Sequence, residues 1–127
     1  MKKSEISIIP ATMDHAKEFY GGRDIKSFKG YVALLKGRVV GIAGLSFQNE
    51  AMLLFSDLKD EMRPYKSDIW KAIGLLGEMV EKTHYPVVAV ANKNEKRSEE
   101  LLTKLGFSPS GQANPDGSKI FWRFPNG

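Results

Sequence analysis

The sequence predicts an α/β protein of the α+β kind, with a central mixed, mostly antiparallel sheet of six to seven strands flanked by three to four helices. Three observations predict it. A hairpin and a third strand follow each other at 30–58, as in an antiparallel meander. An amphipathic helix at 68–82 then leads to an apolar strand at 85–91, and such a helical crossover requires a locally parallel pair. Two short strands end the chain, the second at 118–124.

A single domain over residues 1–127 is expected, because this length suits one core and no long linker divides it. Hydrophobic residues make up 42% and charged residues 27%, the balance of a globular rather than a disordered chain. No apolar run reaches the roughly 18–20 residues of a membrane span, so we expect no membrane partner. The chain has no cysteine, which excludes disulfides and thiolate chemistry and suits a cytoplasmic protein.

The first elements follow from local patterns. Residues 5–9 alternate and are β-branched, and Pro10 ends this short strand. Thr12 is the expected N-cap of a helix at 13–20, which Gly21 and Gly22 stop. Residues 23–29 are polar and leave room for an additional short helix. The meander that follows consists of a strand at 30–35, a turn at Lys36-Gly37, a return strand at 38–47 and a strand at 51–58, apolar up to Phe55 and expected to be buried on both faces.

The second half is equally regular. Ser67 is the expected N-cap of the helix at 68–82, whose core-facing stripe includes Trp70. A further amphipathic helix at 95–105 has acids early and Lys104 late, and Gly106 closes it. Residues 120–124 alternate, so their aromatic side chains divide between two faces of the last strand. A strand with two apolar faces is central or covered, which raises a homodimer or another protein partner as a possibility.

The formal net charge is +4, and the basic residues are spread along the chain. Their first interpretation is an ordinary solvated surface. A groove for an anion such as a nucleotide cofactor comes second. No basic stripe with interleaved aromatics is present, which argues against a nucleic-acid partner. His15 and His84 lack the spaced acids or cysteines of a metal site, so no metal is expected.

The element order, the hairpin GRVVGIAGL at 37–45 and above all LLTKLGF at 101–107 resemble the GCN5-related N-acetyltransferase (GNAT) family. The resemblance covers residues 5–124 and implies the acyl-CoA N-acyltransferase fold. It also implies acetyl-CoA or coenzyme A as cofactor, with its pyrophosphate on a Gln/Arg-x-x-Gly-x-Gly/Ala turn at the start of the long helix. Free amides at a helix N-terminus hold an anion, and glycines let it approach.

The resemblance places the cofactor between the strands at 51–58 and 86–91. Backbone groups of Ser56, Asp57 and Leu58 would bond the pantetheine arm. The side chains and amides expected at the phosphates are those of Arg63, Tyr65, Lys66 and Ser67.

Two positions depart from the family pattern. Lys66 and Asp68 stand where the turn usually has small residues, and a carboxylate in the first turn competes with an anion for the same amides. Leu102 stands where a tyrosine often acts as general acid toward the leaving thiolate. The segment at 66–68 then serves as a well-capped helix start, and the cofactor site is degenerate.

A transfer to an amine needs a base. The resemblance places it near the third strand of the meander, where Glu50, Asp57 and Glu61 are the candidates. Asp57 is the best placed, at the end of the apolar run, and Glu61 is the second choice. The alternative for each is a solvated carboxylate or an ion pair with Lys59 or Arg63.

Two functions remain open. In the first, the chain keeps the fold without the chemistry and resembles small head-assembly and internal virion proteins of tailed bacteriophages, found in the host cytoplasm or the virion. In the second, it is an active acyl-CoA-dependent N-acetyltransferase that acts on an amine of a small molecule or a protein. The first is preferred here, because it accounts for the altered turn.

Overall fold

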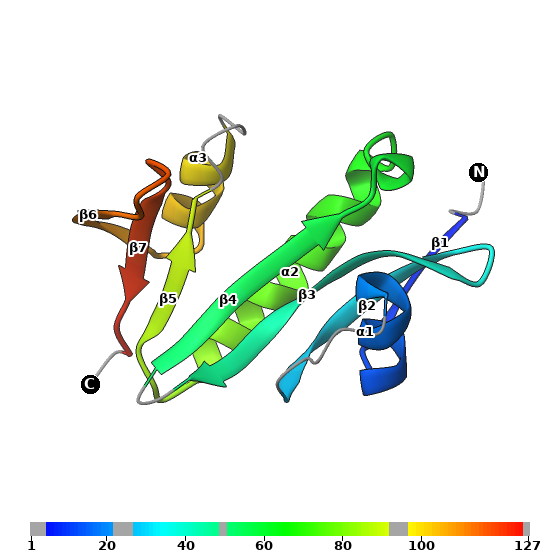
Figure 1. Cartoon of the computed structure of the whole chain (residues 1–127), viewed down its shortest axis with the longest axis horizontal. Coiled ribbons are helices and arrows are strands. Elements are labelled where there is room, and N and C mark those ends of the chain that lie inside the picture. The colour runs from blue at the N-terminus through cyan, green and yellow to red at the C-terminus, as the bar shows by residue number, and fades with distance from the viewer. Residues whose placement is uncertain (1–4, 22–26, 49–50, 92–96, 126–127) are drawn as a thin grey trace.

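The computed structural model describes residues 5–21, 27–48, 51–91 and 97–125. Within them, seven strands form one sheet in the order β1-β2-β3-β4-β5-β7-β6, and the pairs are antiparallel except β4 and β5 (Figure 1). This confirms the predicted mixed, mostly antiparallel sheet. The elements are β1 (Ile6–Pro10), α1 (Met13–Tyr20), β2 (Phe28–Leu35), β3 (Arg38–Gln48), β4 (Ala51–Leu58), the 3-10 turn η1 (Asp60–Met62), α2 (Lys66–Lys82), β5 (Val87–Val90), α3 (Arg97–Lys104), β6 (Ser108–Ala113) and β7 (Lys119–Arg123).

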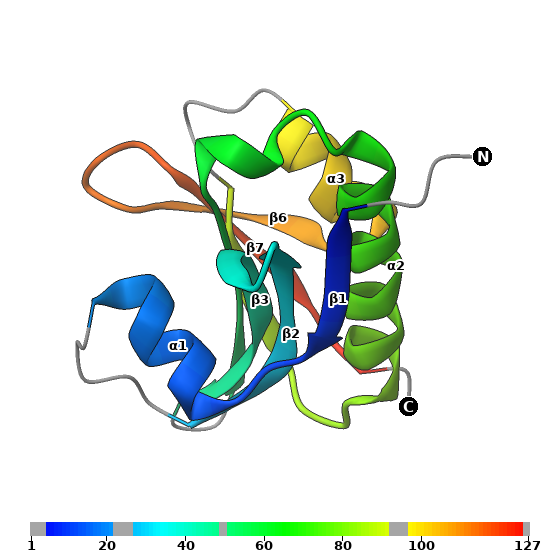
Figure 2. The same ribbon diagram turned by 90° about the vertical axis from the view of Figure 1, so that its right-hand side faces the viewer.

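The helices cover the two faces of the sheet unequally. Figure 2 shows α1 on one face, here called the α1 face, and α2 with α3 on the other. On the α2 side, Val80 and Leu102 from these helices pack with Phe107 and Phe121 in one core cluster. On the α1 face, Ala16 is fully buried against β2 and β3. The additional helix allowed before β2 would fall largely in 22–26, outside the described residues.

Several local predictions are confirmed. The Thr12 side chain accepts from the backbone N–H of His15, and His15 Nδ1 accepts from the backbone N–H of Thr12, so the two form a capping box. Lys36 and Gly37 both have positive φ, at 52° and 82°, as a two-residue hairpin turn demands. Gly106 ends α3 with φ 91°, and Phe107 N–H donates to the Leu102 carbonyl behind it.

The predicted start of α2 is wrong. The helix begins at Lys66 with Tyr65 as its N-cap residue, and Tyr65 makes no side-chain cap hydrogen bond. Ser67 therefore lies inside the first turn rather than at the cap. The cause is the preceding 3-10 turn, which runs almost directly into the helix: Tyr65 N–H donates to the Met62 carbonyl at 2.9 Å. The first turn of α2 is thus less capped than its sequence suggests.

Two predictions of burial are wrong, one for β4 and one for α2. Residues 51–55 of β4 are half-buried rather than buried on both faces, because, among the described residues, α1 lies mainly over β2 and β3 and only its last turn reaches β4. Trp70 is 52% exposed and does not belong to the core stripe of α2. By strand register, the apolar strip that the described helices leave open over β4, β5 and β7 consists of Leu53, Val88, Val90, Ile120, Trp122 and Phe124. Phe55 lies at its border, where it packs against the cluster under α1.

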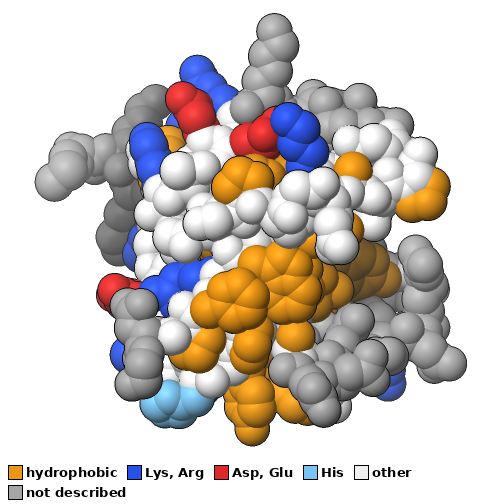
Figure 3. All heavy atoms as spheres, turned by 90° about the vertical axis from the view of Figure 1, so that its left-hand side faces the viewer, with side chains coloured by type: hydrophobic (Ala, Val, Ile, Leu, Met, Phe, Trp, Pro, Cys, Tyr) orange, Lys and Arg blue, Asp and Glu red, His pale blue; other side chains and the backbone are white. Residues whose placement is uncertain are grey.

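Figure 3 shows hydrophobic side chains gathered on the side of the molecule that carries β6 and β7. There the rings of Trp122 and Phe124 stack with centroids 5.6 Å apart, and Phe124 is 65% exposed. Phe47 and Tyr85 make a second, edge-on aromatic pair. The expectation that residues 120–124 present aromatics on both faces is confirmed, since Phe121 is buried on the opposite face. A homodimer through this strip stays a prediction.

Two glycines allow β2 and β3 to approach closely. Gly30 and Gly44 are register partners. A Cβ added to Gly30 would lie 2.0 Å from the backbone oxygen of Ala43, and one added to Gly44 would lie 2.3 Å from the backbone oxygen of Lys29. No side chain fits at either position, so β2 and β3 depend on this pair for their spacing.

Both outer strands of the sheet contain a proline. β1 ends at Pro10, which pairs with Tyr31 of β2. β6 contains Pro109, and its register with β7 shifts between Pro109 and Ala113. Prolines and bulges are typical of edge strands, because an edge strand needs no N–H on its outer side.

Candidate functional site

The candidate site is the divergence of β4 and β5, called here the splay. The two strands are registered only over three pairs, which end at Leu54 and Ala89. β4 continues for four residues beyond this point, to Leu58. Figure 1 shows β4 and β5 diverging toward their carboxyl ends. Parallel strands that separate in this way leave backbone groups of both strands without their usual sheet partners.

The backbone of β4 has a definite orientation at the splay. Met52 N–H donates to the Pro86 carbonyl on the β5 side, and Lys59 N–H donates to the Val40 carbonyl on the β3 side. Alternate residues point their N–H and C=O groups to opposite neighbours, and β4 pairs with β3 without a register shift. Ser56 and Leu58 therefore direct these groups toward the splay. The backbone of Asp57 faces β3, so of the three residues predicted for the pantetheine arm only Ser56 and Leu58 present amides there.

The Asp57 side chain lies on the α1 face, just beyond the last registered pair. Its Oδ2 accepts a hydrogen bond from the hydroxyl of Tyr20, the last residue of α1. The sequence allowed an ion pair of Asp57 with Lys59 or Arg63, but the contact that the structure describes for this carboxylate is the one with Tyr20. Tyr20 was not recognised from the sequence, because 37 residues separate it from Asp57 and no local pattern connects them.

The second candidate base, Glu61, is held elsewhere. Its Oε2 lies 2.6 Å from Nη2 of Arg38, at the start of β3, which pairs with β4 on the side away from β5. Arg63, predicted at the phosphates, donates from Nε to Oδ1 of Asp60 at 2.9 Å, and its side chain is 62% exposed. Glu50, the remaining candidate base, lies outside the described residues.

The first turn of α2 follows the end of β4 through the short turn η1. Lys66 and Ser67 are the first two helical residues, and both are exposed. Tyr65 has a different surrounding from the one predicted. Its ring packs with the core cluster of Met62, and its hydroxyl donates to Oε2 of Glu5 at 3.1 Å. That hydrogen bond to the Glu5 carboxylate, aided by desolvation, raises the pKa of Tyr65 above its usual value.

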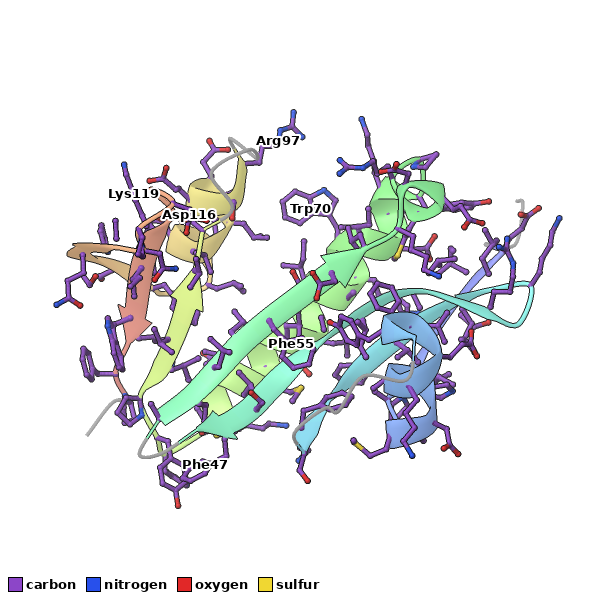
Figure 4. All side chains as sticks on the ribbon, in the orientation of Figure 1. Phe47, Phe55, Trp70, Arg97, Asp116 and Lys119 are labelled. Atoms are coloured by element: carbon purple, nitrogen blue, oxygen red, sulfur yellow. The ribbon has the colours of Figure 1, made fainter. Side chains whose placement is uncertain are left out.

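Trp70 was missed as a site residue and lies between the two helices that flank the splay. Gly77 of α2 faces α3, since a Cβ there would lie 3.1 Å from Cδ2 of Leu105. Trp70 stands seven residues earlier, on the same face of the helix. Its ring is 5.4 Å from Nζ of Lys104 of α3. Figure 4 shows Trp70 directed from α2 toward α3. Its exposure results from the separation of the two helices.

Leu102, where the family pattern often has tyrosine, is buried in the core with Phe107. It presents no proton donor to the splay. Within the described part of the chain, no group of three acidic or histidine side chains could hold a metal ion. No helix among the described residues is both long enough and apolar enough to span a membrane.

Comparison with solved structures identifies the fold. The ribosomal-protein-S18-alanine N-acetyltransferase of Escherichia coli matches with a TM-score of 0.63 and 12% identity, covering 96% of both chains. A protein from Acinetobacter baylyi ADP1 proposed to be an acetyltransferase matches with a TM-score of 0.70 and 15% identity, covering 98% of this chain and 94% of that one. The ribosomal-protein-S5-alanine acetyltransferase of Vibrio fischeri matches with a TM-score of 0.61 and 12% identity, covering 99% and 96%.

No protein-family model and no curated protein matches the chain. At these identities the structural likeness shows the fold alone. Seven strands in the order described, the parallel pair at β4 and β5 and helices on both faces agree with that likeness. The chain therefore has the GNAT fold, the acyl-CoA N-acyltransferase fold.

Proposed function

We propose that the protein is an acyl-CoA-dependent N-acetyltransferase. The observation that carries this proposal is the splay, where Ser56 and Leu58 direct backbone groups toward the side from which β5 has diverged. An acyl-pantetheine arm is an extended amide chain, and it would pair with such a strand as a neighbouring strand does. The solved structures that share the fold are named as acetyltransferases.

The α2 N-terminus fits the phosphate end of the cofactor. Tyr65 makes no side-chain cap hydrogen bond, so the amides of the first turn, with the positive end of the helix dipole, can receive an anion. Lys66 adds an exposed ammonium group in that turn, and Arg63 lies three residues before it. The first-turn Asp68 weakens the site electrostatically but does not remove the backbone donors. Bound acetyl-CoA would supply the acyl group as a thioester.

Asp57 is the proposed general base. It lies on the α1 face at the splay, and a carboxylate there would take the proton of an acceptor amine directly or through one water. Glu61, paired with Arg38 on the far side of β4, is the second choice. The open apolar strip shares the face of Asp57, so an acceptor would meet an apolar floor beside one carboxylate.

Calorimetric titration with acetyl-CoA tests the proposal. We expect micromolar binding, and ligand at a hundredfold excess over its dissociation constant should stabilise the fold by about 2.7 kcal/mol. Ser56→Pro removes one N–H at the splay without removing a bond to β3, so it should weaken binding about tenfold, while Ser56→Ala keeps the N–H and should bind normally. The absence of heat and of a thermal shift at millimolar acetyl-CoA would refute the proposal.

Trp70 supplies an independent measure of ligand entry. The chain has two tryptophans, so the Trp122→Phe variant leaves Trp70 as the single indole. Because its ring stands between α2 and α3, a ligand that enters the splay should displace it from Lys104 and change its emission. The Trp70→Phe variant, whose remaining indole lies on β7, serves as the control and should change little. Unchanged Trp70 emission at calorimetric saturation would place the ligand elsewhere.

The turnover assay needs an acceptor. Two of the structures with this fold are named for acetylation of an alanine of a ribosomal protein, so peptides with an amino-terminal alanine are the first probes, followed by small primary amines. Release of the coenzyme A thiol is measured with a thiol reagent, and the protein contributes no background because it has no cysteine. The other function considered from the sequence, a virion assembly component, stays a prediction, tested by co-purification with phage particles.

A further inference from the structure

We propose that Tyr20 of α1 is a positioning residue for the Asp57 carboxylate. This inference rests on the proposed function, because it assigns the partner of the proposed base. The Tyr20 hydroxyl donates to Oδ2 of Asp57. A carboxylate whose Oδ2 is held by a donor keeps Oδ1 in one direction, ready to accept the proton of an amine.

The last turn of α1 is attached to the sheet by three consecutive side chains. Oε2 of Glu18 accepts from the backbone N–H of Val39 at 2.9 Å. The ring of Phe19 lies under Nζ of Lys59, 5.4 Å from its centroid, and Tyr20 reaches Asp57. The last turn of α1 thus contacts β3, the end of β4 and Lys59 directly after it. The position of the Tyr20 hydroxyl is therefore set by more than its own hydrogen bond.

The Tyr20 ring is itself restrained. It meets the Phe19 ring edge-on, with centroids 4.9 Å apart. Gly21 ends α1 in the left-handed region with φ 72°, and its N–H donates to the Lys17 carbonyl, so Tyr20 stays within the helix. Removal of the hydroxyl alone leaves these ring and backbone contacts in place. Tyr20→Phe is thus a specific test of the bond to Asp57.

The test is a double-substitution cycle on turnover and on stability. With acetyl-CoA and an alanine-initiated peptide, Tyr20→Phe should lower kcat about tenfold, with the KM of the peptide and the Kd of acetyl-CoA within about twofold. In an Asp57→Asn background the same substitution should change kcat less than about twofold, because Tyr20 acts only through that carboxylate. Tyr85→Phe is the matched control, because it removes a hydroxyl from the exposed aromatic pair with Phe47. It should leave kcat, the KM of the peptide and the Kd of acetyl-CoA unchanged.

A merely structural tyrosine would lower kcat equally in both backgrounds, and that result, or an unchanged kcat in active Tyr20→Phe enzyme, overturns the inference. A wild-type protein that binds acetyl-CoA but acetylates none of the probes would count against the proposed function instead. A stability cycle needs no activity and uses Asp57→Ala, which cannot accept the Tyr20 hydrogen bond. In urea unfolding of wild type, Tyr20→Phe, Asp57→Ala and the double variant, non-additive midpoints support the contact between Tyr20 and Asp57, and additive midpoints overturn it.

Discussion

Replacing Gly30 by alanine should destabilise the fold by at least about 3 kcal/mol, the upper end of what overpacking usually costs. The new methyl carbon would lie 2.0 Å from the Ala43 carbonyl oxygen and 2.6 Å from Cα of Gly44, and both of these atoms belong to the backbone. Backbone cannot rotate away as a side chain can, so β2 and β3 would have to separate. Against a total stability of roughly 5–15 kcal/mol, the melting temperature should fall by many degrees.

Gly74 provides a control with the opposite sign. It lies in the middle of α2, and a Cβ there would meet nothing within 4 Å. Alanine has the higher helix propensity, so Gly74→Ala should stabilise the protein by about 0.5–1 kcal/mol. Urea denaturation of wild type and of the two variants measures both changes in the free energy of unfolding. A Gly30→Ala protein with wild-type stability would mean that the close approach of β2 and β3 is not required.

Asp57→Asn should reduce kcat for acetyl transfer by about 10²–10⁴-fold, the range that general bases contribute. The amide has nearly the same shape as the carboxylate, and its oxygen can still accept the Tyr20 hydrogen bond, so binding of acetyl-CoA and the melting temperature should stay close to wild type. The measurement is steady-state release of the coenzyme A thiol at saturating acetyl-CoA, with peptide concentration varied.

Glu61→Gln is the matched control, because it makes the same chemical change on a carboxylate that already pairs with Arg38. An exposed ion pair of this kind contributes about 1 kcal/mol or less, so both activity and stability should change little. A large loss of kcat in Glu61→Gln together with an active Asp57→Asn would make Glu61 the general base instead of Asp57. Glu61 would then have to break its ion pair with Arg38 during the reaction.

Local patterns in the sequence predicted the elements well, and contacts between distant residues account for what they missed. The limits of β4 at residues 51–58, the N-cap at Thr12 and the turn at Lys36-Gly37 depend on residues within a few positions of one another. The exposure of Trp70 depends instead on the separation of α2 and α3, which no helical periodicity encodes.

In the candidate site, too, some features follow from local sequence and others depend on contacts between distant residues. Its location at the end of β4 could be predicted, because the element order resembles a known fold and Asp57 ends an apolar run. Which amides of β4 face the splay depends on the register with β3 and β5, and a shift of one residue would have exchanged Asp57 with Ser56. The displaced start of α2 has a local cause instead, since η1 leads almost directly into the helix and the residue pattern at 66–68 did not reveal this turn.

The prolines in the two outermost strands, Pro10 and Pro109, bear on how copies of the protein meet. A strand that lacks an N–H is a poor template for a further strand, so neither rim of the sheet invites growth into a fibril or a continuous sheet across two molecules. Concentrated solutions should therefore resist amyloid formation, and any pairing of two chains has to bring side-chain surfaces together instead of joining their backbones.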